Sequence, residues 1–277
     1  MPRGAIVLAY CGAPPLPAEI WSHWRLNPVV LLVMFGWLAI YLVGARRTRG
    51  AKSPIPARKR VLFVSGWAIA TLALVSPLCP LSVSLFAARA TQHVLLILFA
   101  APLIAASEPL AAARALFNVS WKARMRPRER PMLAAAVFAV FLWIWHSPLG
   151  YASTFASVTL YWAMHLSLFA SACWLWSSLL RTEGALGGGL LASIASSVQM
   201  GILGALITLS PRPFYAPHFL TTDAWGFTPL QDQQLGGVIM WVPGCTVFLI
   251  VAMIALARCF ARLSRVAAPL RSDEAVR

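Results

Sequence analysis

The chain alternates long apolar runs with short polar segments, and the runs approach the length of a lipid bilayer. A membrane-spanning helix needs about 20 mostly apolar residues. We expect seven transmembrane helices, at residues 28–43, 61–75, 92–106, 132–146, 161–180, 190–209 and 235–257. The second to fourth runs are short, so their helices must reach into the flanking residues.

Composition supports this interpretation of the pattern. The 277 residues are 60% hydrophobic and 11% charged, with a mean hydropathy of +0.74, whereas about 25% charged residues is usual in soluble domains. The sequence therefore predicts an all-α, polytopic membrane protein built as a seven-helix bundle. We divide it into an outer N-terminal lead-in of residues 1–27, a membrane domain of residues 28–260 and a basic tail of residues 261–277.

Positive charge falls in every second loop. The 23 Lys and Arg residues gather mainly at residues 46–60, 114–130, 181 and 258–271. Under the positive-inside rule these segments are cytoplasmic, which places the N-terminus outside and the C-terminus inside. The net charge of +15 is then mainly a topology signal, and we expect the lipid bilayer and no nucleic acid as a partner. The N-terminal apolar stretch is barely long enough for a signal peptide and has no convincing cleavage site, so we expect it to stay as an outer lead-in.

Histidines lie toward the predicted outer ends of three consecutive helices. His93 opens the third run, His146 closes the fourth and His165 lies about one turn into the fifth. At 1.5 Å per residue each is within about 10 Å of the outer end of its helix, so the three can share one depth. Neutral imidazole ligates copper, zinc and iron. These residues are a candidate metal site, although each alone also suits an interfacial histidine bonded to a carbonyl group or water.

The seventh run is preceded by a polar cluster, "DQQLGG", at residues 232–237. A carboxylate at Asp232 would cap the helix that follows it. Asp232 or Gln233 would otherwise fix histidine tautomers or act as a ligand, and Gln233 would also suit a bond to a neighbouring loop. Met240 lies further along this run, where its thioether would either favour copper(I) or simply pack in the core.

Several stretches together resemble one known family. They are "QHVLLILFAAPLI" at 92–104, "WIWHSPLGY" at 143–151, "GALITLSPRPFYAPH" at 204–218 and "DQQLGGVIMWVPG" at 232–244. Their order is similar to that in the CtaG family of cytochrome c oxidase assembly factors, over residues 20–260. The positions that match the family's motifs are Gln92, His93, His146, His165, Asp232, Gln233 and Met240.

The resemblance implies a function at the bacterial inner membrane. It suggests a non-enzymatic assembly factor whose functional face is periplasmic, where copper is delivered to haem-copper oxidases. Its partners would be oxidase subunits and periplasmic copper chaperones. One position departs from the family pattern, because Arg89 stands where a further histidine is expected. A guanidinium cannot ligate a metal, so the site either uses fewer histidines, binds an anionic group such as a haem propionate or a lipid phosphate, or has no metal role.

Alternatives from other functional classes remain open. The histidines also suit an intramembrane b-haem protein, with two of them as axial ligands and Arg89 paired with a propionate. A transporter is disfavoured by the lack of charged residues in the predicted span interiors. The five cysteines form no CxxC or CxxxC pair, and Cys79 is either a soft ligand or a small apolar residue.

Overall fold

Helices make up all of the regular structure that the computed structural model describes, at residues 10–48, 54–117, 130–180 and 186–274. Five of these helices are long and apolar enough to cross a membrane, or up to seven if two bent pairs each form one span. The prediction of an all-α polytopic protein is confirmed. Parts of the expected lead-in and basic loops, and the last three residues, lie outside the described residues.

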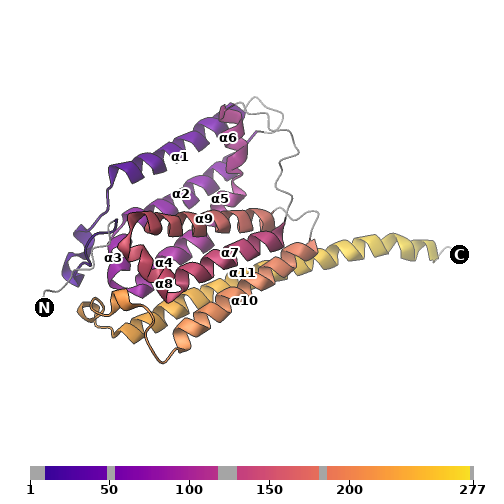
Figure 1. The fold of residues 1–277 in the computed structure, drawn as a ribbon. Helices are drawn as coiled ribbons and strands as arrows, with labels where there is room; N and C mark the ends of the chain where they lie inside the picture. The colour runs from indigo at the N-terminus through magenta and orange to yellow at the C-terminus, as the bar shows by residue number, and fades with distance from the viewer. Residues whose placement is uncertain (1–9, 49–53, 118–129, 181–185, 275–277) are drawn as a thin grey trace.

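Four continuous helices frame the bundle (Figure 1). They are α1 (Pro28–Arg47), α9 (Val158–Leu180), α10 (Leu186–Leu209) and α11 (Pro229–Glu274). Helix α11 runs well beyond its apolar stretch and projects from the bundle. The tail expected from residue 261 therefore begins inside this helix.

Two spans are bent at prolines. Helix α2 (Ala57–Val75) meets α3 (Leu78–Ser84) at 47°, and α7 (Pro131–His146) meets α8 (Pro148–Ala156) at 71°. Pro77 and Pro148 stand at the two breaks, where a proline lacks the N–H that would continue the helix and disfavours a helical residue before it. The apolar runs predicted at 61–75 and 132–146 end at these breaks.

The third span differs most from its prediction. It comprises α4 (Phe86–Val94), a π-helical stretch η3 (Leu95–Ala100) and α5 (Ala101–Ala106). It is 72% buried inside the protein, against 22% to 39% for the other four long spans. Its polar first turns are thus covered by protein rather than by lipid. A search for lipid-facing apolar runs does not detect them. Arg89 consequently lies within the span, contrary to the expectation that the span interiors carry no charge.

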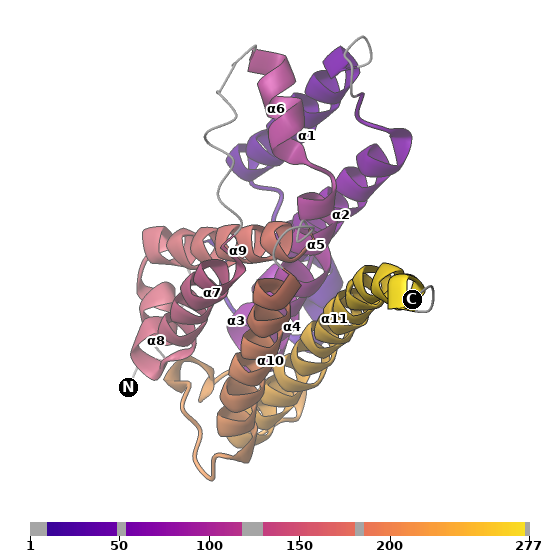
Figure 2. The ribbon, with the colours of Figure 1, turned by 90° about the vertical axis from the view of Figure 1, so that its right-hand side faces the viewer.

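A further helix, α6 (Pro109–Phe117), was not predicted. It packs against α1 at one edge of the bundle, and α10 and α11 pack together at the opposite edge (Figure 2). The α1–α6 contact is close because Gly44 of α1 sits on the backbone of Ala112 in α6.

The N-terminal lead-in is fastened to the bundle. Cys11 forms a disulfide with Cys79 of α3, and both are buried. The Arg25 side chain donates to the Tyr10 carbonyl oxygen, which holds together the two ends of the described part of the lead-in. Cys79 packs in the main apolar core, as one interpretation expected, but the disulfide rules out a free soft ligand. The pairing was missed because it joins two cysteines that are 68 residues apart, and no local motif signals it.

The glycine pair of the "DQQLGG" cluster sets how closely α11 approaches two neighbours. A side-chain carbon on Gly236 would overlap the Phe86 ring and press on the backbone of Ala87 in α4. On Gly237 it would meet Thr208 of α10. Small residues allow such close contacts between membrane helices.

Substituting Gly236 by alanine should therefore destabilise the protein. We expect Gly236→Ala to lower the free energy of unfolding by about 1 to 3 kcal/mol, as overpacking does in tight interiors. Gly187→Ala is the matched control, because open space surrounds Gly187 and alanine favours the helix. Thermal unfolding in detergent compares the two, and equal melting temperatures would show that the α4–α11 contact is looser than described.

Candidate functional site

Three histidines from three spans meet in the interior of the bundle. His93 of α4 lies between His146 at the end of α7 and His165 near the start of α9, with ring centroids 5.6 Å and 5.4 Å apart. All three side chains are buried. Two imidazoles that bind one ion at about 2 Å hold their ring centres roughly 5 to 6 Å apart. The structure thus brings together the three residues that the sequence selected.

Backbone carbonyl groups orient two of these rings. Nδ1 of His146 lies 2.7 Å from the Leu142 oxygen, and Nδ1 of His165 lies 3.0 Å from the Tyr161 oxygen. A ring nitrogen that faces a carbonyl oxygen is the protonated one, which leaves the lone pair on Nε2. Metal-ligating histidines are commonly held in this way by a backbone carbonyl.

His93 has neither ring nitrogen satisfied. Both atoms are buried and have no hydrogen-bond partner. Leaving a buried polar group unpaired costs about 1 to 3 kcal/mol, so such groups in native proteins call for an explanation. A ligand bonded to His93 would supply one.

Gln92 joins the cluster from the same helix. Its amide nitrogen donates to the Ala73 oxygen at 2.7 Å, which turns its Oε1 toward Nε2 of His165 at 3.3 Å. With Nδ1 of His165 protonated, both facing atoms are acceptors. A cation or a second ring proton between them would make this contact attractive.

The cluster is not a ready-made metal site. Within the described ranges, no group of three or more His, Cys, Asp or Glu side chains is arranged to hold a metal ion as it stands. The three rings would have to turn to share one ion. Met240 is buried in the main apolar core, and its role as a ligand stays a prediction.

Asp232 caps a helix other than its own. Its Oδ2 accepts from the Phe86 N–H at 2.7 Å and its Oδ1 from the Ala87 N–H at 3.0 Å, at the first turn of α4. The start of α11 is instead closed by Thr228 and Gln231, whose side chains each accept from the other's backbone N–H. The expected cap of its own helix is therefore wrong, because α11 begins earlier than its apolar run and turns Asp232 toward α4.

Gln233 fastens the connection between α10 and α11. Its amide oxygen accepts from the Phe214 N–H, and its amide nitrogen donates to the carbonyl oxygens of Ile207 and Arg212, at 3.1 Å and 3.3 Å. These are bonds to the backbone of the last turn of α10 and of the loop that follows it. In the structure Gln233 therefore shapes the connection between α10 and α11, and its assignment to a cofactor stays a prediction.

Arg89 is fully buried one turn before His93. Its Nη1 donates to Oγ1 of Thr154 at 3.1 Å, and its guanidinium carbon lies 4.5 Å from the ring centre of Phe155 and 5.3 Å from that of Tyr151. Thr154, Phe155 and Tyr151 were missed by the sequence analysis. The only sequence feature that points to these three residues is the proline in "WIWHSP". The chain bends there, and α8, which carries them, turns back toward the site.

A family model that spans most of the helices described above assigns the chain to a family. The model, described as cytochrome c oxidase caa3 assembly factor (Caa3_CtaG), matches residues 39–262. The chain belongs to this family. No curated protein and no solved structure matches it. The match includes all the candidate site residues, whereas the lead-in with Cys11 lies outside it.

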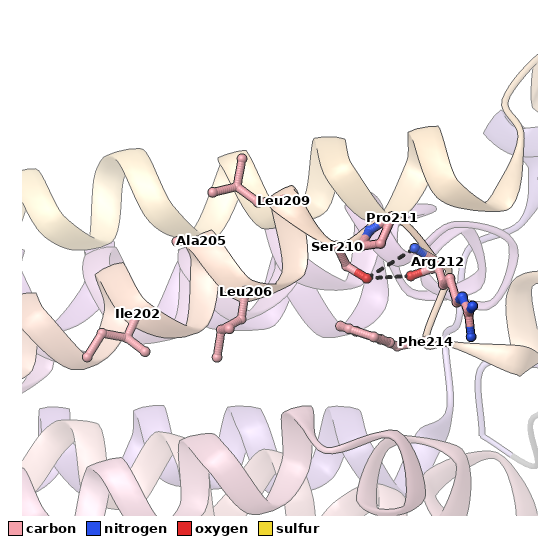
Figure 3. A pocket seen from close by; sticks show the side chains of 8 residues that line it. All are labelled: Ile202, Ala205, Leu206, Leu209, Ser210, Pro211, Arg212 and Phe214. Atoms are coloured by element: carbon pink, nitrogen blue, oxygen red, sulfur yellow. Dashed lines mark hydrogen bonds between the residues drawn. The ribbon is translucent and has the colours of Figure 1, made fainter.

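This assembly factor also has an open groove of about 640 Å³ away from the histidines. Ile202 and Leu206 point from α10 into the same space, with Phe214 beyond them (Figure 3). The lining is almost entirely apolar apart from Ser210 and Arg212. Such a surface suits lipid chains and offers no ligand set for a metal.

His218, in the connection before α11, bonds to the site from outside the spans. Its Nε2 lies 2.6 Å from the Tyr151 hydroxyl group. Burial, with a smaller contribution from the charge of Arg89, lowers the pKa of His218 to about 3. The ring is thus neutral, and Nε2 accepts the hydroxyl proton.

Replacing Asp232 should loosen α4. We expect Asp232→Ala to lower the free energy of unfolding by about 1 to 2 kcal/mol, because two N–H groups at a helix start lose their acceptor. The control is Asp223→Ala, which removes the same charge at an exposed position. Thermal unfolding in detergent is the measurement. Equal stability of the two variants would contradict the capping role.

The neutral ring of His218 should make stability depend on pH. The unfolded pKa is about 6.5, so between pH 6.5 and 3 the unfolded chain binds a proton that the folded chain does not. The contribution of the neutral His218 ring to the free energy of unfolding is therefore complete above pH 6.5 and declines as the pH falls. We expect the melting temperature of His218→Gln, which keeps an acceptor, to fall less between pH 7.5 and 4.5 than that of the native chain. An unchanged pH dependence in His218→Gln would count against a neutral buried ring.

Proposed function

We propose that this family member supports the maturation of a copper centre in a cytochrome c oxidase, with His93, His146 and His165 receiving copper(I) as cargo. The observation that carries the proposal is the meeting of three buried histidines from separate spans. The family is that of the cytochrome c oxidase caa3 assembly factors. In this scheme the chain holds and transfers an ion, and we assign it no catalytic turnover.

The donor chemistry favours copper(I). His146 and His165 present Nε2 lone pairs, and His93 has two unpaired ring nitrogens. Imidazole suits copper, and a buried site disfavours high charge, so a monovalent ion costs less to bury than a divalent one. Rotation of the rings between the described arrangement and a shared ion would allow both loading and release.

The disulfide supports a periplasmic position for this cluster. The sulfur of Cys11 lies 3.4 Å from the Tyr161 hydroxyl group, and Tyr161 is one turn from His165 on α9. Disulfides persist in oxidising compartments such as the bacterial periplasm and are rare in the cytosol. A cluster on that side of the inner membrane would meet periplasmic copper chaperones as donors and oxidase subunits as acceptors.

Metal content tests the proposal. The full chain is purified in detergent, incubated with copper(I) under a reducing agent too weak to reduce the disulfide, desalted and measured by elemental analysis and absorption. We expect about one copper per chain and no Soret band. His93→Ala/His146→Ala/His165→Ala should lose the copper, whereas His23→Ala, at an exposed histidine outside the cluster, should keep it.

Two results would contradict the copper site. Copper retained by the triple variant would place the site elsewhere, and a Soret band in the native chain would favour the b-haem alternative. The single variant His93→Gln guards against a misfolded triple variant, since glutamine keeps a polar side chain of similar reach. It should lose most of the copper while its melting temperature stays near that of the native chain.

A further inference from the structure

Arg89 has a free hydrogen-bonding edge. Of its three nitrogens, Nη1 donates to Thr154, whereas Nε and Nη2 are buried and have no partner in the part of the chain that the structure describes. The N–H groups of Nε and Nη2 lie parallel along one side of the planar guanidinium. This edge matches the two oxygens of a carboxylate, and such paired bonds are among the strongest in proteins.

The charge of Arg89 also has no counter-charge paired with it among the described residues. The ion pairs among the described residues are His23–Glu19 and Lys59–Glu108, and both oxygens of Asp232 accept from the first turn of α4. Aromatic rings contact the guanidinium, including Tyr161 at 5.8 Å, but such contacts do not use its N–H edge. A buried charge without a partner costs several kcal/mol, so an anion beside Arg89 would be strongly favoured.

A second unpaired side chain lies beside Arg89. His93 is four residues further along α4, a spacing that puts two side chains on the same face of a helix, and its ring nitrogens have no partner. Buried polar groups in native proteins are nearly always bonded. Four such atoms on one helix face, two from each residue, mark a place where a ligand binds.

We propose that Arg89 anchors a buried carboxylate-binding site, in which Nε–H and Nη2–H each donate to one oxygen of the ligand and His93 borders it. The carboxylate neutralises the guanidinium that would otherwise repel a cation at the histidines. It comes either from a small free carboxylic acid or from the propionate of a haem. The carboxylate site does not depend on copper binding, and the experiments that test it measure no copper.

Binding of labelled formate tests whether the site binds a carboxylate, whatever the source of that carboxylate. Equilibrium dialysis of the purified, metal-free full chain with ¹⁴C-formate, in chloride buffer of fixed ionic strength, should show one site per chain. We expect Arg89→Gln to bind at least tenfold more weakly. Arg89→Lys, which keeps the charge and loses the paired edge, should be intermediate. Arg212→Gln, at an exposed arginine of the outer connection, is the matched control and should bind as the native chain does.

A second experiment, with haem, distinguishes a small carboxylic acid from a haem propionate as the source of the carboxylate. It needs no variant. Haem b and its dimethyl ester, which lacks free carboxylates, are titrated into the native chain and followed by the Soret band. Tighter binding of haem b by tenfold or more assigns the carboxylate to a propionate, whereas formate binding without such a preference assigns it to a small acid. The proposal is overturned if neither formate nor haem b binds, or if Arg89→Gln, folded by its melting temperature, binds as the native chain does.

Discussion

The carboxylate of Asp232 on the first turn of α4 is the contact on which the site depends. Within a membrane protein every backbone N–H group away from water needs an internal acceptor, and the first turn of a helix has none of its own. Asp232 supplies two acceptors from α11, while Gly236 lets the two helices approach closely. A polar helix can therefore begin inside the bundle rather than at its surface.

What α4 carries explains why it is buried. Arg89, Gln92 and His93 are each almost fully shielded, and none would be tolerated against lipid. Around them, carbonyl groups of α7 and α9 fix the rings of His146 and His165. Two of the surrounding rings are thus oriented, while His93 and one edge of Arg89 remain unsatisfied among the described residues. Oriented neighbours around unpaired groups are what a binding site needs.

The sequence predicted the parts that depend on contact with lipid. Apolar runs gave the helical class and most spans, and helix rise alone placed three histidines at one depth. The start of α4 was missed, because hydropathy does not distinguish a polar turn outside the membrane from one buried among other helices. The Cys11–Cys79 disulfide and the return of Thr154 to Arg89 depend on bends and on long-range contacts, which a local pattern does not contain.

The most direct test of the central claim is copper K-edge X-ray absorption of the full chain loaded with copper(I). A site made by His93, His146 and His165 predicts a first shell of nitrogen ligands at about 2.0 Å, with the outer-shell scattering of imidazole rings. One longer sulfur distance would add Met240 as a ligand. A first shell dominated by sulfur, without imidazole scattering, would contradict the histidine cluster as the copper site.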